Sequence, residues 1–142
     1  MIYNNLFQIY ILIALSVMLH ELAHCIVALW LGVKDIKINI GDEFFSITIG
    51  RLRFSPLVFN GNVDVDEESL VSNTKIGIVL FFISGNIANV LIIIVCSFFV
   101  SVSDYFAILM QINMILIISN SLPVLGTDIN KIRYYLKLKR NE

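Results

Sequence analysis

The sequence predicts an all-α membrane protein: three transmembrane helices, with a small membrane-associated β-hairpin region between the first and second. Its composition is 58% hydrophobic and 15% charged, against roughly 45–50% and 25% in soluble domains. Three apolar runs, at about residues 6–33, 76–100 and 105–125, are each long enough to cross a hydrocarbon core of about 30 Å. At 142 residues the chain is expected to form a single domain.

The first apolar run is longer than a span requires. As a helix it would extend roughly 42 Å at 1.5 Å per residue, so it must tilt or leave the bilayer at one end. Lys34 and Asp35 mark that end, and Gly32 is a suitable place for the helix to stop.

Residues 36–63 change to a period of two. Apolar and polar residues alternate at 36–40, 45–49 and 51–54, which predicts two or three short strands. A turn at 60–62 is expected to close this region. The acidic residues at 64–68 are interpreted as a solvated loop.

The positive charges are distributed on one side of the predicted topology. All ten Lys and Arg residues fall within 34–75 and 131–140. A short link at 101–104 makes the second and third runs a helical hairpin. By the positive-inside rule, the 34–75 loop and the C-terminus are cytoplasmic and the N-terminus is outside. The basic tail, 129–142, mixes cationic and apolar residues, as an anchor at the lipid bilayer surface would. A net charge of −1 gives no indication of nucleic-acid binding.

An H-E-x-x-H sequence lies inside the first apolar run, at His20, Glu21 and His24. On a helix, residues four apart project from one face, so both imidazoles can bind one Zn²⁺ while Glu21 acts as a general base. These are the only two histidines in the chain. Ionisable groups inside a membrane helix are costly and indicate a functional site. A buried polar network without metal is the alternative interpretation.

A catalytic zinc site needs a third protein ligand. Asp128 follows a stretch in which Pro123 and Gly126 interrupt the third apolar run. Interrupted backbone at membrane depth is found where protein or a water-filled cavity surrounds it. Asp128 is therefore either a ligand or only the marker of a helix end. Cys25 and Cys96 are interpreted as small buried hydrophobic residues.

Two asparagines stand out in the second apolar run. Ser84 and Ala88 form a small-xxx-small pair that allows close helix packing. Asn86 and Asn89 lie on adjoining faces of the same helix. Polar packing contacts explain them, and Asn89 is also a candidate hydrogen-bond partner of the active-site region.

Together these motifs resemble the site-2 proteases, which are intramembrane zinc metalloproteases. The H-E-x-x-H motif is complete at residues 20–24. The motif N-x-x-P-x-x-x-x-D-G is matched by Asn120, Pro123 and Asp128, with Ile129 in place of the glycine.

The middle motif of that family, small-G-P-x-x-N, is matched by Ser84, Gly85 and Asn89, with Asn86 in place of the proline. The resemblance covers roughly residues 10–130.

The resemblance implies that Asp128 is the third zinc ligand and that Asn120 polarises the scissile carbonyl. It implies a zinc-dependent intramembrane endopeptidase whose substrate is a transmembrane or membrane-associated peptide. An extended substrate is expected to pair with a loop strand, with Ile47 and Ile49 as candidate contacts. A homo-oligomer or a regulatory membrane partner is compatible with so short a chain, and the high Ile and Asn content suggests a bacterial cell membrane.

The sequence leaves two other functions open. An inactive family member acting as a membrane chaperone or regulator need not retain Glu21. A zinc transporter or sensor would need ligands along a path through the membrane, whereas the sequence shows one cluster.

Overall fold

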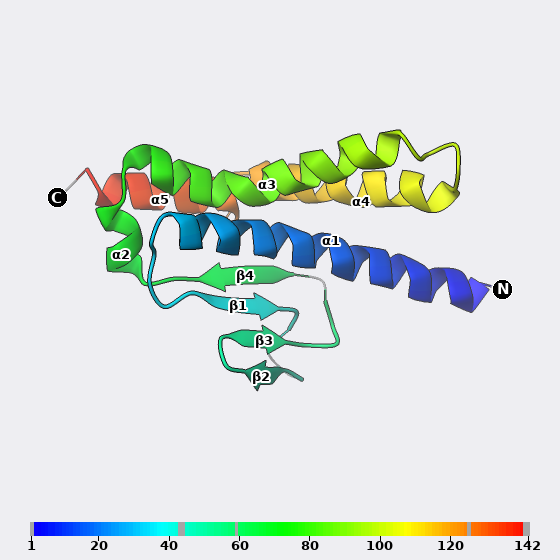
Figure 1. Ribbon diagram of the computed structural model, residues 1–142, viewed down its shortest axis with the longest axis horizontal. Helices are drawn as coiled ribbons and strands as arrows, with labels where there is room; N and C mark the ends of the chain where they lie inside the picture. Colours follow the sequence, from blue (N-terminus) through cyan, green and yellow to red (C-terminus); the bar gives the residue numbers. More distant parts are fainter. Residues whose placement is uncertain (1, 43–44, 59, 125, 141–142) are drawn as a thin grey trace.

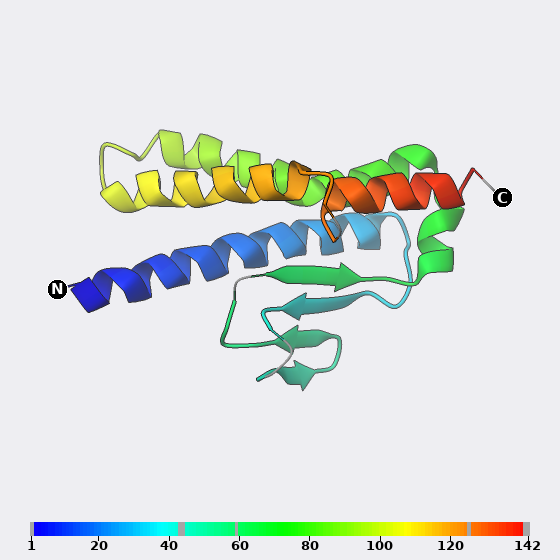
Figure 2. The same ribbon diagram turned by 180° about the vertical axis from the view of Figure 1, so that it is seen from behind.

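The computed structural model describes residues 2–42, 45–58, 60–124 and 126–140. Three long helices dominate these parts: α1 (Ile2–Trp30), α3 (Lys75–Ser97) and α4 (Asp104–Ser121). Two shorter helices are α2 (Glu67–Ser72) and α5 (Asp128–Leu138). Figures 1 and 2 show α1 lying between the α3–α4 hairpin on one side and a small sheet on the other.

The long helices confirm three candidate membrane spans by length and composition, at Leu6–Trp30, Lys75–Ser97 and Asp104–Ser121. All three end earlier than the apolar runs do. Gly32 adopts a φ of 71°, the left-handed conformation that commonly follows a helix end. Leu122 adopts a ψ of 139° because the ring of Pro123 disfavours helical geometry in the preceding residue. The third helix therefore ends at Ser121 and not near residue 125.

A buried polar pair joins α1 to α4 within the helical layer. The Nδ2 of Asn113 donates to Ser16 Oγ at 3.0 Å and to the Leu109 carbonyl at 2.8 Å. Both side chains are fully buried. Hydrogen bonds of this kind hold apolar helices together where the hydrophobic effect between them is weak.

The region between α1 and α2 is more than a hairpin. Its strands are β1 (Lys37–Ile40), β2 (Ile47–Ile49), β3 (Leu52–Phe54) and β4 (Gly61–Asp64), and they form one four-stranded sheet in the order β2-β3-β1-β4. Strands β2 and β3 are the antiparallel hairpin that the alternation predicts. Strand β1 pairs in parallel with β3 and antiparallel with β4.

Two local predictions in this region are wrong. Residues 60–62 do not close the region as a turn, because Gly61 and Asn62 pair with Ile40 and Asn39 of β1. The acidic stretch is not entirely a loop, because Asp66 caps α2 by accepting a hydrogen bond from the Ser69 backbone at 2.9 Å. Pairing with a distant strand and side-chain capping both override the local turn and charge signals.

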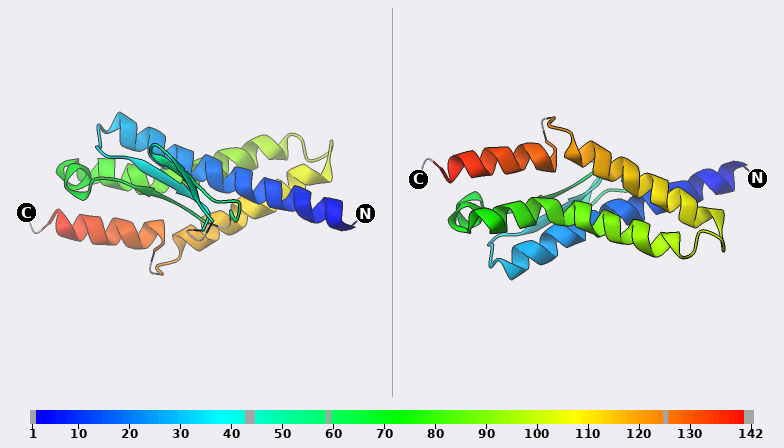
Figure 3. Two further views of the ribbon diagram at one scale, coloured as in Figure 1. Left: turned by 90° about the horizontal axis from the view of Figure 1, so that it is seen from below. Right: turned by 90° about the horizontal axis from the view of Figure 1, so that it is seen from above.

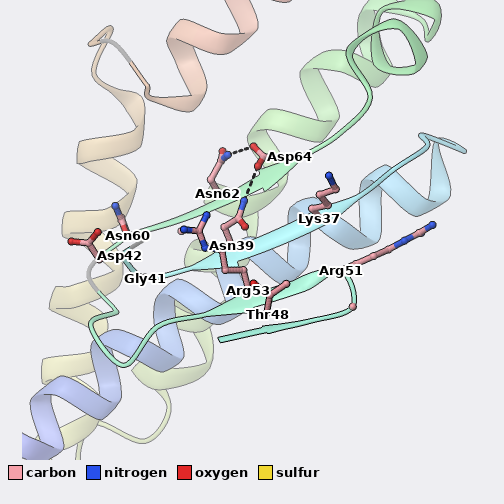
Figure 4. Close-up of a pocket in the computed structure, with 12 residues that line it drawn as sticks. Lys37, Asn39, Gly41, Asp42, Thr48, Arg51, Arg53, Asn60, Asn62 and Asp64 are labelled. Atoms are coloured by element: carbon pink, nitrogen blue, oxygen red, sulfur yellow. Dashed lines mark hydrogen bonds between the residues drawn. The ribbon is translucent and has the colours of Figure 1, made fainter. Parts of the chain in front are cut away.

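The sheet has one apolar and one polar face. Ile40 packs with Val17 of α1, and Val63 contributes to the core shared with α3. The opposite face carries a polar hollow of about 680 Å³ (Figure 4). Among the residues lining this hollow are Lys37, Asn39, Thr48, Arg51, Arg53, Asn62 and Asp64.

The basic tail begins as helix α5, which runs alongside the first half of α3 (Figure 3). The rings of Tyr135 and Phe82 lie 5.3 Å apart, and Ile132 and Leu136 pack against the same core. Anchoring of this tail at a lipid surface stays a prediction.

Candidate active site

The two histidines of the H-E-x-x-H sequence lie one turn apart on the face of α1 that meets α3. Their exposed fractions are 4% each. The Nε2 atoms of His20 and His24 lie 3.1 Å apart. The helix thus brings two ring nitrogens to one buried point, as the spacing predicts.

Asp128 reaches the same point from the first residue of α5. Its Oδ2 lies 3.4 Å from His20 Nε2 and 3.5 Å from His24 Nε2. The turn that delivers it is tied by Thr127, whose Oγ1 donates to the Leu122 and Val124 carbonyls at 2.6 and 2.8 Å. Asp128 has an exposed fraction of 8%, and an aspartate carboxyl is ordinarily ionised at neutral pH.

The ring of His24 is oriented by the backbone of α3. Its Nδ1 lies 2.6 Å from the Phe81 carbonyl oxygen, which can only accept a hydrogen bond. Nδ1 therefore carries the proton, and Nε2 presents its lone pair toward Asp128. Ser84 Oγ lies 3.1 Å from the same Nδ1 and donates to the Phe81 carbonyl at 2.7 Å.

Asn89 performs the corresponding task for His20. Its amide Nδ2 lies 3.0 Å from His20 Nδ1, while its buried Oδ1 has no hydrogen-bond partner. Turning the amide by 180° satisfies that oxygen, because Oδ1 then accepts the Nδ1–H of His20. Nε2 of His20 is then also a lone pair directed at the cluster.

Three buried acceptors consequently converge without a proton between them. The two Nε2 atoms and Asp128 Oδ2 form a triangle with sides of 3.1, 3.4 and 3.5 Å, and Oδ2 has no hydrogen-bond donor. The lone pairs on these three atoms repel one another unless a cation lies between them. Zinc ligands bound tetrahedrally at about 2.0–2.2 Å lie roughly 3.3–3.5 Å from one another. The described residues His20, His24 and Asp128 thus fit a divalent metal site.

Glu21 faces a different neighbour from the two histidines. Its exposed fraction is 5%, and it lies against Gly61 at the start of β4. A Cβ at position 61 would lie 2.6 Å from Glu21 Oε1 and 2.8 Å from Cδ. Helix α1 therefore directs its imidazoles at α3 and its carboxylate at the sheet.

The remaining predicted site residues divide into two groups. Asn120 joins the cluster, since its Nδ2 lies 3.4 Å from His20 Nε2. Asn86 lies next to the end of α4, with Nδ2 3.5 Å from Ser121 Oγ, and Pro123 is exposed in the following loop.

Ile47 and Ile49 are not brought to the cluster. They lie on β2, at the opposite edge of the sheet from β4, and their exposed fractions are 68% and 74%.

Sequence reasoning missed the roles of two glycines. A Cβ on Gly85 would overlap His20 and His24, just as one on Gly61 would overlap Glu21. The small-G-P-x-x-N motif includes Gly85, and a glycine inside the apolar helix 75–97 is a second signal, since glycine destabilises a helix interior unless close contact requires it. The sequence places Gly61 in a predicted turn, which does not indicate that it lies against Glu21.

The fold and the site are those of a metalloprotease-like protein with three candidate membrane spans. A family model described as peptidase family M50 matches residues 8–103, which include most of α1, the sheet and α3. The chain therefore belongs to peptidase family M50, the site-2 protease family, and the resemblance is confirmed. Members of this family are generally metalloproteases. No curated protein matches the chain.

Proposed function

We propose that this protein is a zinc-dependent intramembrane endopeptidase that cuts transmembrane or membrane-associated peptides. The observation that carries the proposal is the convergence of His20 Nε2, His24 Nε2 and Asp128 Oδ2 within 3.5 Å of one another. Membership of a peptidase family supports it. The three apolar helices favour a membrane location.

The residues of the chain divide the chemistry among them. His20, His24 and Asp128 would hold Zn²⁺, which supplies a Lewis acid that activates water and polarises a carbonyl group. The Glu21 carboxylate takes a proton from the attacking water and delivers it to the leaving amine. Asn120 Nδ2 donates a hydrogen bond to the substrate carbonyl oxygen. Phe81 O and Asn89 orient the two imidazoles, which keeps both Nε2 lone pairs directed inward.

The substrate must reach the site in an extended form. The exposed fractions of the metal-binding residues and Glu21 are only 4–8%, so a helix cannot enter without rearrangement. Pairing with an open strand edge would hold the peptide extended.

The geometry favours the free edge of β4 for this role over the edge of β2. Strand β4 contains Gly61, which contacts Glu21. A cavity of about 300 Å³ runs beside it, bounded by β4, α3 and α5. The residues lining this cavity are Asn62, Val63, Asp64, Val65, Phe81, Phe82, Lys131, Tyr134 and Tyr135.

The proposed orientation follows from the charges. The loop between α1 and α3 and the C-terminus face the cytoplasm of a bacterial cell, and the N-terminus faces outward. A homo-oligomer or a regulatory membrane partner is the expected source of control over cleavage.

Glu21→Gln tests the proposal. Glutamine has nearly the same shape but cannot accept the proton, so the purified variant should bind zinc normally and lose about 10²–10⁴ in cleavage rate. The measurements are metal content and cleavage of a single-span peptide in detergent. Cleavage by Glu21→Gln at the wild-type rate would show that the assigned mechanism is wrong. A transporter or sensor needs the ligands but no base, so its activity would survive this substitution.

A further inference from the structure

Lys131 links the helix that carries Asp128 to the strand that covers Glu21. It lies three residues after Asp128, on the same face of α5. Its Nζ donates to Asn62 Oδ1 of β4 at 2.7 Å. We call this contact the Lys131–Asn62 bridge.

Asn62, the partner of Lys131 on β4, is held in place by its own contacts. Asn62 follows Gly61, whose backbone lies against the Glu21 side chain. The Nδ2 of Asn62 donates to Asp64 Oδ1. Asn39 of the neighbouring β1 donates to Asp64 Oδ2 at 2.7 Å. Figure 4 shows Asn39, Asn62 and Asp64 together on the polar face of the sheet. The bridge therefore connects α5 to a strand that cannot move independently of β1.

The helix end of the bridge is tied to the preceding loop. Thr127 Oγ1 donates to the Leu122 and Val124 carbonyls, but it makes no side-chain capping bond to α5. The chain arrives there from a turn in which Gly126 has a φ of 88°. Further along α5, Tyr135 packs on Phe82, and Lys139 Nζ donates to the Val71 carbonyl at 2.7 Å. Those contacts hold the far part of α5. Nearer to Asp128, Ile132 packs against the core and Lys131 supplies the hydrogen bond to the sheet.

We propose that Lys131 is a positioning residue: through its bridge to Asn62 it fixes Asp128 and Glu21 relative to each other. This inference rests on the proposed function for its effect on cleavage, but not for its effect on metal binding. Both residues of the bridge line the cavity beside β4.

The test compares two lysines of the same helix in the full-length protein in detergent. Lys131→Met removes the bridge, and Lys139→Met removes an equally short hydrogen bond far from the site. Groups that orient metal ligands typically change metal affinity by about 10–100-fold. We expect Lys131→Met to weaken zinc affinity by roughly tenfold in competition with a chelator, and Lys139→Met to leave it unchanged. Hydrogen exchange at residues 128–131 of the zinc-free protein should accelerate only in Lys131→Met.

A double-mutant cycle makes the assignment specific. Asn62→Ala should weaken zinc affinity as Lys131→Met does, and the double variant should be no weaker than either single variant. Additive losses, or a Lys131→Met protein with wild-type zinc affinity, would overturn the proposal. For cleavage, we expect kcat to fall more than KM rises, because the reacting groups are displaced. If Glu21→Gln cleaves normally while the zinc results hold, the proposed function fails and the positioning role stands.

Discussion

Gly85 of α3 lies directly against the imidazole of His20. A methyl group at position 85 would overlap ring atoms Cε1 and Nε2 of His20 and would also reach Nε2 of His24. The absence of a side chain lets α3 approach closely enough for Asn89 to contact His20 Nδ1 and for the Phe81 carbonyl to contact His24 Nδ1. One glycine thus permits both contacts that orient the histidines.

We therefore predict that Gly85→Ala abolishes high-affinity zinc binding. The added Cβ has no flexible neighbour to displace, since rigid rings lie on both sides of it. One or both imidazoles must rotate away, which breaks the triangle of ligand atoms. Metal content of the purified variant, measured after zinc reconstitution and removal of excess zinc, checks this.

The matched control is Gly77→Ala, near the start of the same helix. A Cβ there would lie 3.1 Å from Leu31 Cδ2, the far end of a flexible side chain. Alanine is also favoured over glycine within helices by about 1 kcal/mol. Gly77→Ala should keep full zinc content. Equal zinc content in the two variants would contradict the role assigned to Gly85.

The parts of the fold that the sequence could predict are those encoded by local pattern. Apolar length predicts the three candidate spans, and the spacing of His20 and His24 predicts that both rings project from one face of the helix. Asp128 lies far from them along the chain. The break at Pro123 and the family motif make it a candidate ligand. Its distance along the chain does not show whether it lies near the histidines in space.

Contacts between distant segments could not be predicted from the sequence. The parallel pairing of Ile38 with Leu52 and the antiparallel pairing of Ile38 with Val63 make the four-stranded sheet. Alternation shows that such strands exist but not which strands are neighbours. For this reason Ile49 was an attractive substrate contact in the sequence, whereas in the structure β4 is the strand beside Glu21.

Metal removal should lower the stability of the protein. A ligand that binds only the folded state contributes about 2.7 kcal/mol at one hundred times its Kd. Zinc should therefore raise the Tm of the chelator-treated wild type, and it should not raise that of His20→Ala or His24→Ala. Asp128→Asn keeps an oxygen ligand without its charge and should respond only at higher zinc concentration. A His20→Ala protein with the wild-type zinc response would rule out the assigned ligands.

The distribution of basic residues predicts the orientation in the membrane. Four of the ten Lys and Arg residues lie between α1 and α3, Lys75 begins α3, and the other five lie in the tail. Reporter fusions at residue 142 should be active in the cytoplasm, and fusions in the link at 101–104 should be active outside. The opposite pattern would reverse the assigned topology.

The position of β4 predicts where an extended substrate lies. In a background with Cys25 and Cys96 replaced by alanine, Val65→Cys places a thiol beside the cavity next to β4. Ile49→Cys places one on β2, at the other edge of the sheet. A cleavable single-span peptide carrying one cysteine near its scissile bond should form a disulfide with the Val65→Cys protein. The Ile49→Cys protein should not form one. Adding Glu21→Gln should trap more of the peptide, because bound substrate is no longer cut.

Cross-linking mainly through Ile49→Cys would instead assign substrate pairing to β2. That result would require the sheet to rearrange before cleavage, because β1 and β3 separate β2 from the strand that contacts Glu21.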